Sequence, residues 1–208
     1  MDGIADMGGR QGYGRMPDQR DNIPFHYDWE PLTYIVAILA AENGWWTFDS
    51  GRHAIERVPP KDYMRAGYYE RVLIGMAALC VEHGVVAHDE LEERAGGKGS
   101  YPLSTPIGPG DALSRPDRPD FEIGDKVIVR DESPTGHSRA PKYCQGKRGE
   151  IVGIAPVAHF PGEMAHKMQA AREHTYHVAF EGSELWSEVK DGSSVVVDLF
   201  ASYLDPLQ

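Results

Sequence analysis

The chain has 208 residues, 41% of them hydrophobic, and a formal net charge of -11 at pH 7. That length suffices for one large domain or for two small domains that each bury a core. The acidic balance, without a basic patch, argues against nucleic acid or an anionic membrane surface as a partner. Because no apolar run reaches the length of a membrane span and residues 1–20 lack an apolar signal region, we expect a cytoplasmic protein.

The first 22 residues have the composition of an extended arm. Glycines interrupt this segment repeatedly, and it has neither helical nor strand periodicity. Such a segment cannot bury much apolar surface on itself. Composition leaves two interpretations open: a disordered terminus, or an arm that becomes ordered on a partner and uses Ile4, Met7, Tyr13 and Met16 as anchors.

Helical patterns dominate the first half of the chain. A helix is predicted over residues 31–43, because Pro31 suits the first helical position. A second, longer helix is predicted over residues 60–83, and Asp89 can cap a third helix over residues 90–94. The loop between the first two helices is expected to hold three aromatic rings and an arginine: Trp45, Trp46, Phe48 and Arg52.

Residues 96–120 are rich in proline and glycine, as linkers are. From Phe121 onward, β-branched runs alternate with turn signals, so the period changes from helix to strand. Short strands at this density indicate a small barrel or roll, and residues 163–173 are either a helical insertion or a long loop. The fold class is therefore α+β. The predicted strands cover residues 126–130, 149–154, 175–180 and 194–199.

The sequence contains no complete catalytic or metal-binding motif. Its histidines match no H-E-x-x-H pattern, and no carboxylate falls in register with them. There is no G-x-S-x-G turn and no C-x-x-C pair. Cys80 is expected to be a small core residue, and Cys144 lies in a loop. We therefore expect no metal or cofactor site in this chain.

Two arginines in Gly-punctuated segments are the remaining candidates for chemistry. Arg52 follows Asp49-Ser-Gly51, and Arg139 precedes a predicted strand. Either can be an ordinary solvated arginine. A functional role requires an anion, because the planar, always charged guanidinium can hold an oxyanion in a fixed orientation.

Four separated segments carry a resemblance to a known family: residues 1–9, 52–63, 133–152 and 197–204. The third contains Gly136-His-Ser-Arg-Ala-Pro-Lys-Tyr143. In this order the four segments resemble the β subunit of nitrile hydratase, which hydrates nitriles to amides. The resemblance extends over nearly the whole chain and is weakest near residues 96–120 and 155–174.

The resemblance implies that the metal lies in a partner, the α subunit, as Fe(III) or Co(III). In that family two cysteine ligands of the metal are oxidised, and two β-subunit arginines hydrogen-bond their oxygens. The matching positions here are Arg52 and Arg139, with Arg57 as a weaker candidate for the first role. The position matching the family's substrate-facing tyrosine is Tyr68.

The aromatic residues have two open interpretations. Those that would line an apolar substrate entry are Trp45, Trp46, Phe48 and Tyr69. Such rings suit an aliphatic or aromatic nitrile tail. They could equally form a core or a subunit contact, and Tyr68 could likewise pack in a core.

The resemblance also implies an architecture. Residues 1–30 form an extended arm that contacts the partner, residues 31–95 a helical domain, residues 96–120 a linker and residues 121–208 an SH3-like β barrel. The complex is expected to be an αβ heterodimer that pairs again into α2β2, with a small nitrile as substrate.

Two classes of rival function are a thiocyanate hydrolase subunit and a non-catalytic protein, the latter either a metallochaperone or a plain binding module. Thiocyanate hydrolase divides the β-like sequence between two polypeptides, whereas this chain carries both halves. A non-catalytic metallochaperone should lack the second half and the segment around Arg139, and a plain SH3-like binding module would not need the arm and helices. The sequence therefore favours the nitrile hydratase β subunit over both.

Overall fold

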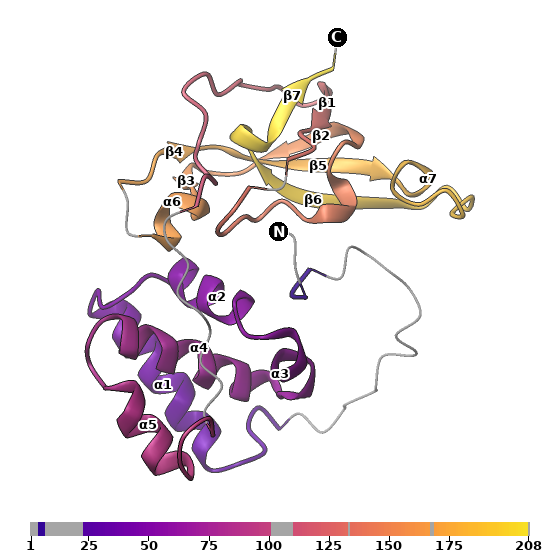
Figure 1. The fold of residues 1–208 in the computed structure, drawn as a ribbon. Coiled ribbons are helices and arrows are strands. Elements are labelled where there is room, and N and C mark those ends of the chain that lie inside the picture. The colour runs from indigo at the N-terminus through magenta and orange to yellow at the C-terminus, as the bar shows by residue number, and fades with distance from the viewer. Residues whose placement is uncertain (1–3, 7–22, 101–109, 133, 167–168, 208) are drawn as a thin grey trace. The chain divides into compact units, whose positions relative to one another are not determined.

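The computed structural model describes residues 4–6, 23–100, 110–132, 134–166 and 169–207. The chain divides into two units. One contains residues 10–108 and is helical; the other contains residues 1–9 and 109–208 and is built on a sheet. The α+β class is confirmed, and Figure 1 follows the helices of the first unit into the strands of the second.

The helical unit has five helices among its described residues. They are α1 Trp29–Glu42, α2 Phe48–Glu56, α3 Pro60–Arg65, α4 Tyr68–Glu82 and α5 His88–Ala95. Both α1 and α2 pack on α4. A small core lies between them, with Cys80 packed against it, and it consists of Ala40, Trp46, Ala54 and Leu79.

One glycine sets the distance between α2 and α4. A β-carbon at Gly75 on α4 would lie 2.8 Å from Cγ1 of Ile55 and 3.2 Å from its backbone nitrogen. Real β-carbons do not approach neighbours that closely, so the contact depends on the missing side chain. The tight packing brings α2 against α4 beside the small core.

The predicted helix over residues 31–43 is confirmed, but it begins two residues earlier. Pro31 is thus the third helical residue; its missing N–H costs nothing, because the first four N–H groups of a helix lack intrahelical partners. The third predicted helix also begins earlier, at His88. Ala87 occupies the capping position, so Asp89 lies inside the first turn and the prediction that it caps was wrong.

Two predictions about the segment from 45 to 83 were wrong. The expected loop around Arg52 is helix α2, which begins because the Thr47 hydroxyl accepts a hydrogen bond from the Ser50 N–H at 3.0 Å. The expected single helix over residues 60–83 is interrupted at Gly67, whose backbone is extended. There the Gly67 N–H donates to the Glu70 carboxylate at 2.6 Å and a new helix begins.

The second unit contains a five-stranded antiparallel sheet in the order β6-β5-β2-β1-β7. Its strands are β1 Lys126–Val129, β2 Arg148–Ile154, β5 Thr175–Glu181, β6 Ser194–Phe200 and β7 Leu204–Pro206. All four predicted strands are confirmed. In the register of the sheet, Ile151 pairs with Val178, which pairs with Val197.

Short elements surround this sheet (Figure 1). They are η1 Lys142–Cys144, β3 Ala158–His159, α6 Pro161–Ala165, β4 Arg172–Glu173, α7 Gly182–Leu185 and η2 Ala201–Tyr203. Residues 163–173 are thus neither one helix nor one loop. The side chains of one sheet face form the core, including Val127, Val129, Ile151, Val178, Phe180, Leu199 and Leu204.

Among the described residues, no helix has both the length and the apolar character needed to cross a membrane. The longest, α4, has 15 residues, whereas a spanning helix requires about 20. The predicted arm anchors Met7, Tyr13 and Met16 and the linker residues 101–109 lie outside the described residues.

Candidate functional site

A pocket of about 230 Å³ lies on the helical unit, between α1, α2 and α4. Its lining includes five residues that the sequence analysis singled out: Trp46, Phe48, Arg52, Tyr68 and Tyr69. Trp45 does not line it; this ring is exposed and stands edge-on to Trp46 at 6.2 Å. Residues from separate helices thus meet around one hollow that is lined mostly by apolar side chains.

Arg52 is the cationic residue of this lining. Its side chain is 53% exposed, and Nη1 donates to Oδ1 of Asp49 at 2.9 Å, one turn earlier on α2. An exposed ion pair of this kind contributes little to stability. Because the guanidinium has five N–H donors, contact with Asp49 leaves it able to bind a second anion.

Arg57 lies five residues later and has different surroundings. Its side chain is only 5% exposed, and Nη1 donates to Oε1 of Glu82 at 2.8 Å. That ion pair joins the residue after α2 to the last residue of α4. Arg57 therefore has a structural contact within the unit, and Arg52 is the better candidate for an external anion.

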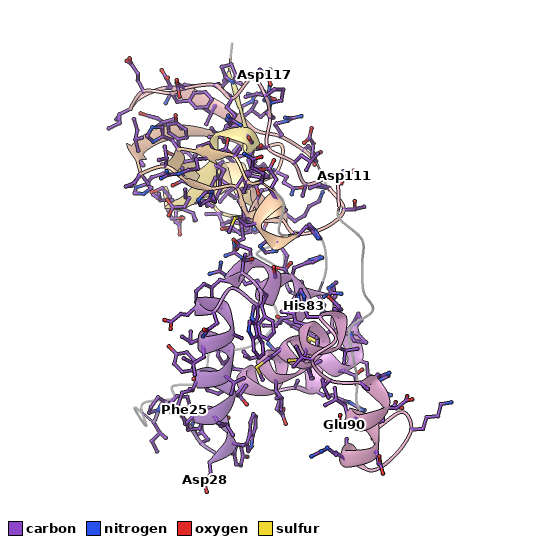
Figure 2. The ribbon with its side chains drawn as sticks, turned by 90° about the vertical axis from the view of Figure 1, so that its left-hand side faces the viewer. Phe25, Asp28, His83, Glu90, Asp111 and Asp117 are labelled. Atoms are coloured by element: carbon purple, nitrogen blue, oxygen red, sulfur yellow. The ribbon has the colours of Figure 1, made fainter. Side chains whose placement is uncertain are left out.

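Tyr68 and Tyr69 begin α4 and form a T-shaped pair, with ring centroids 5.0 Å apart. Tyr68 is 72% exposed, so it is not a core residue of the described unit. Tyr69 also packs 5.2 Å from the ring of Phe25, which Figure 2 shows at the same end of the helical unit as Asp28. Loss of solvent around Tyr69, followed by the charges of Tyr68 and Glu30, raises the pKa of its hydroxyl.

Several apolar residues of the pocket were not among the predicted site residues, although the family resemblance places the position of Val72 near the substrate. Val72 and Met76 lie one and two turns after Tyr68 on α4, and Ile55 faces them from α2. The spacing of Tyr68, Val72 and Met76 at i, i+4 and i+8 indicates that they lie on one face of a helix. It did not indicate that α2 exists and closes the pocket.

Arg139 lies in the sheet unit, on the loop before η1. The residues on either side are buried: His137, Ser138 and Ala140 are at most 4% exposed, whereas Arg139 is exposed. The backbone N–H of Arg139 donates to the Tyr203 hydroxyl at 3.1 Å. The loop thus presents one exposed side chain from a buried backbone.

The far end of this loop is also held by side chains. The Lys142 N–H donates to Oδ2 of Asp6 at 2.7 Å, so a residue of the predicted arm contacts the loop within this chain. Cys144 is fully buried, and its thiol donates to the Pro141 carbonyl at 3.0 Å. Burial raises the pKa of this thiol to about 12, which makes it a poor nucleophile at neutral pH.

These features define a class of protein. The pocket offers apolar rings with one guanidinium, and the loop offers a second guanidinium from a fixed backbone. Guanidinium groups and aromatic rings are suited to binding and orienting a ligand, and neither set of side chains supplies an evident reacting atom. Side chains of this kind are typical of a binding protein, or of an enzyme subunit that contributes binding groups.

Comparison with known proteins identifies which subunit this is. The family model for the N-terminal part of the nitrile hydratase beta subunit matches residues 1–116, and the model for its C-terminal part matches residues 111–206. The chain belongs to the family of nitrile hydratase β subunits. Nitrile hydratase is a lyase that hydrates nitriles, and it functions as a complex of this subunit with an α subunit.

Relatives with this name align along the full length. The nitrile hydratase subunit beta of Rhodococcus erythropolis is 43% identical over 215 residues, which are 99% of both chains. That of Pseudomonas chlororaphis is 39% identical and covers 99% of this chain and 96% of its own. The low-molecular weight cobalt-containing nitrile hydratase subunit beta of Rhodococcus rhodochrous is 35% identical, and the alignment covers 99% of this chain and 100% of the relative.

A solved structure of thiocyanate hydrolase from Thiobacillus thioparus, a recombinant apo-enzyme, aligns with 61% of this chain and 95% of its own. Its TM-score is 0.40 and its sequence identity 18%, and a similarity this weak supports no argument about function.

Proposed function

We propose that Arg52 and Arg139 hydrogen-bond the oxygens of oxidised, metal-bound cysteines of the α subunit. The pocket carries this proposal, because it gathers Arg52 with Tyr68 and three other rings that were assigned to one site from the sequence. Arg139 contributes in the same way from its own unit, as an exposed guanidinium on a held loop.

The physical reason for two arginines is the cost of burying charge. An S–O⁻ group at a subunit interface loses its hydration and is stable there only if it is paired. A charge-assisted hydrogen bond from a guanidinium offsets that cost and fixes the oxygen in space. It also limits further oxidation of a reversible sulfenate.

The same pocket supports a role in substrate binding. Phe48, Trp46 and Tyr69 offer apolar surface to the tail of a nitrile, and the exposed Tyr68 offers a hydroxyl to the nitrile nitrogen or to water. The apolar floor from Val72 and Met76 favours an uncharged tail. We infer that this chain orients a small, uncharged nitrile.

The metal belongs to the α subunit in this proposal, and the name of the cobalt-containing relative supports a metal in such a complex. When bound, an Fe(III) or Co(III) ion supplies a Lewis acid that polarises the nitrile or activates water. The residues of this chain hold the oxidised cysteine oxygens, exclude water with aromatic side chains and position the substrate.

The α subunit needs a docking surface, and α1 offers one. Four apolar side chains on α1 are exposed at helical spacing: Leu32, Ile35, Val36 and Leu39. Contiguous apolar exposure of this kind is typical of protein–protein contacts. We propose that α covers this stripe in an αβ heterodimer, which pairs again into α2β2.

The finer architecture also belongs to the proposal. The described sheet has five antiparallel strands with β6 and β7 at its edges, and small antiparallel sets of this size, which generally twist strongly, are the basis of an SH3-like barrel. The proposed domains are an arm over residues 1–30, helices over 31–95, a linker over 96–120 and the barrel over 121–208. Both family halves lie on one chain, which argues against the divided thiocyanate hydrolase arrangement.

The test is turnover of the co-expressed complex. Arg52→Lys and Arg139→Lys keep the charge but lose the forked geometry, so each should lower kcat by about 10²-fold at unchanged metal content. Amide formation from acrylonitrile measures kcat, and metal analysis measures occupancy.

Arg94→Lys is the matched control. Arg94 is an exposed arginine on α5, paired to Glu90 at 2.9 Å, and its substitution should change kcat by less than about twofold. Full turnover in both Arg52→Lys and Arg139→Lys complexes would rule out the proposed arginine roles.

A further inference from the structure

The hydroxyl group of Tyr203 is the feature that the proposed function does not use. Tyr203 ends η2, in the turn between β6 and β7 that Figure 1 draws in yellow. It lies 64 residues after Arg139 in the sequence, yet its hydroxyl accepts the hydrogen bond from the Arg139 N–H. The turn after the last long strand thus holds the arginine loop.

The Tyr203 hydroxyl contacts more than one residue of the loop. The Ser138 side chain also hydrogen-bonds it, and the same serine oxygen accepts from the Ala140 N–H at 3.3 Å. The phenol therefore contacts Arg139 and Ser138, and Ala140 is linked to it only through the Ser138 hydroxyl. Burial of this hydroxyl raises its pKa to about 12, so it stays protonated at the pH of turnover.

The ring of Tyr203 is itself fixed. It packs 5.3 Å from the ring of Phe160 and 6.1 Å from that of Phe200, and it lies against the core of the sheet unit. A rigid anchor of this kind restricts the backbone from which the exposed Arg139 side chain projects. A charged group acts best when its support is already ordered before the ligand arrives.

We propose that Tyr203 is a positioning residue for the reaction: its hydroxyl holds the Arg139 backbone so that the guanidinium meets the α subunit in one orientation. This inference rests on the proposed role of Arg139. Tyr203 does not touch substrate; it acts through the loop.

Tyr203→Phe isolates the hydroxyl, because it keeps the ring and its packing. Tyr176→Phe is the matched control: the Tyr176 hydroxyl is another phenol in the same unit that accepts a backbone hydrogen bond, from the Phe121 N–H at 3.2 Å. Both variants lose a hydrogen bond from a backbone N–H to a phenol, and Tyr203→Phe also loses the contact with Ser138, so the control measures the general cost of losing a buried phenol hydroxyl. Only Tyr203→Phe should affect the Arg139 loop.

The first readout is hydrogen–deuterium exchange in the purified αβ complex. Tyr203→Phe should raise the exchange rate of the Arg139 amide by about tenfold or more, since its acceptor is lost. Tyr176→Phe should leave that amide unchanged and instead affect the Phe121 amide. An unchanged rate at Arg139 in the Tyr203→Phe complex overturns the proposal.

The second readout is kinetic. Tyr203→Phe should lower kcat for acrylonitrile by about tenfold with little change in KM, since a loosened group loses orientation more than ground-state binding. In the Arg139→Lys background the same change should have no further effect, because both substitutions act on one guanidinium. An equal loss in both backgrounds overturns the proposal.

The two proposals fail separately. If Arg139→Lys alone leaves turnover unchanged, the proposed role of Arg139 is wrong, and with it the kinetic role of Tyr203. If Arg139→Lys lowers turnover but Tyr203→Phe changes neither exchange nor kcat, only the positioning role is wrong.

Discussion

Arg52 and Arg57 show how exposure separates two side chains of the same type. They lie five residues apart, yet the side chain of Arg52 is 53% exposed and that of Arg57 is 5% exposed. The buried guanidinium is engaged by Glu82 and ties two helices together. The exposed guanidinium of Arg52 lines a pocket. An added anion there can displace Asp49 or bind beside it to the same guanidinium.

Cys144 gives a prediction at the same scale. Its burial raises the thiol pKa from an ordinary value near 9 to about 12, so the folded chain should resist iodoacetamide at pH 8. In a Cys80→Ser background, alkylation of Cys144 should therefore proceed only at the rate of unfolding and become fast in urea. Mass spectrometry of timed samples measures this rate, and rapid labelling of the native chain would contradict the burial.

The sign of the pH effect follows from the same pKa. The folded pKa of Cys144 lies above the unfolded one, so its contribution to the free energy of unfolding is fully present below about pH 9. It is lost as the pH rises toward about 12. A Cys144→Ala chain should lack this part of the alkaline decline in stability.

At the scale of elements, the helical unit depends on the contact between α2 and α4. Gly75 has no room for a methyl group because Ile55 lies against it, whereas a methyl group at Gly51 on α2 would meet no described atom within 4 Å. The two glycines thus have opposite environments on two helices that pack together.

We predict opposite effects for alanine at these positions. Gly75→Ala should lower the free energy of unfolding by about 1–3 kcal/mol through overpacking, despite the better helix propensity of alanine. Gly51→Ala should raise it by up to about 1 kcal/mol, since only propensity changes. Urea unfolding followed by circular dichroism measures both, and a stabilised Gly75→Ala chain would mean that the two helices separate easily.

At the scale of the whole molecule, the apolar stripe on α1 does not belong to the core of the helical unit, and its side chains are exposed. The core of that unit contains few large residues, while several large apolar residues of α1 face outward. A surface of this kind is expected in a subunit that is complete only with its partner.

Ile35→Glu should therefore prevent capture of the α subunit without unfolding this chain, because it places a charge on the proposed contact. Co-expression with a tag on this chain, followed by the measured ratio of the two subunits, gives the result. Ile123→Glu is the control: Ile123 is 68% exposed in the turn before β1, outside that stripe. Equal recovery of α with both variants would argue that α1 is not the docking surface.

Much of this fold could be predicted from the sequence. The four long strands follow from β-branched runs, and the helices over residues 31–43 and 90–94 follow from period and punctuation, within a few residues. Two of the errors, the unexpected helix α2 and the break at Gly67, both involve glycine. Gly51 lies inside a helix because packing and the Thr47 cap outweigh its propensity, while Gly67 caps the start of α4 because the Glu70 carboxylate accepts a hydrogen bond from its N–H.

The sequence by itself determined the family, the α+β order of the two halves and the identity of Arg52, Arg139 and Tyr68 as candidates, because these depend on local pattern and motif. Only the tertiary structure decided that Arg52 and Tyr68 line one pocket, that Arg57 is engaged by Glu82 and that Tyr203 holds Arg139. These are contacts between residues distant in the chain. No local periodicity encodes them, since they arise when helices and strands pack to bury their apolar faces.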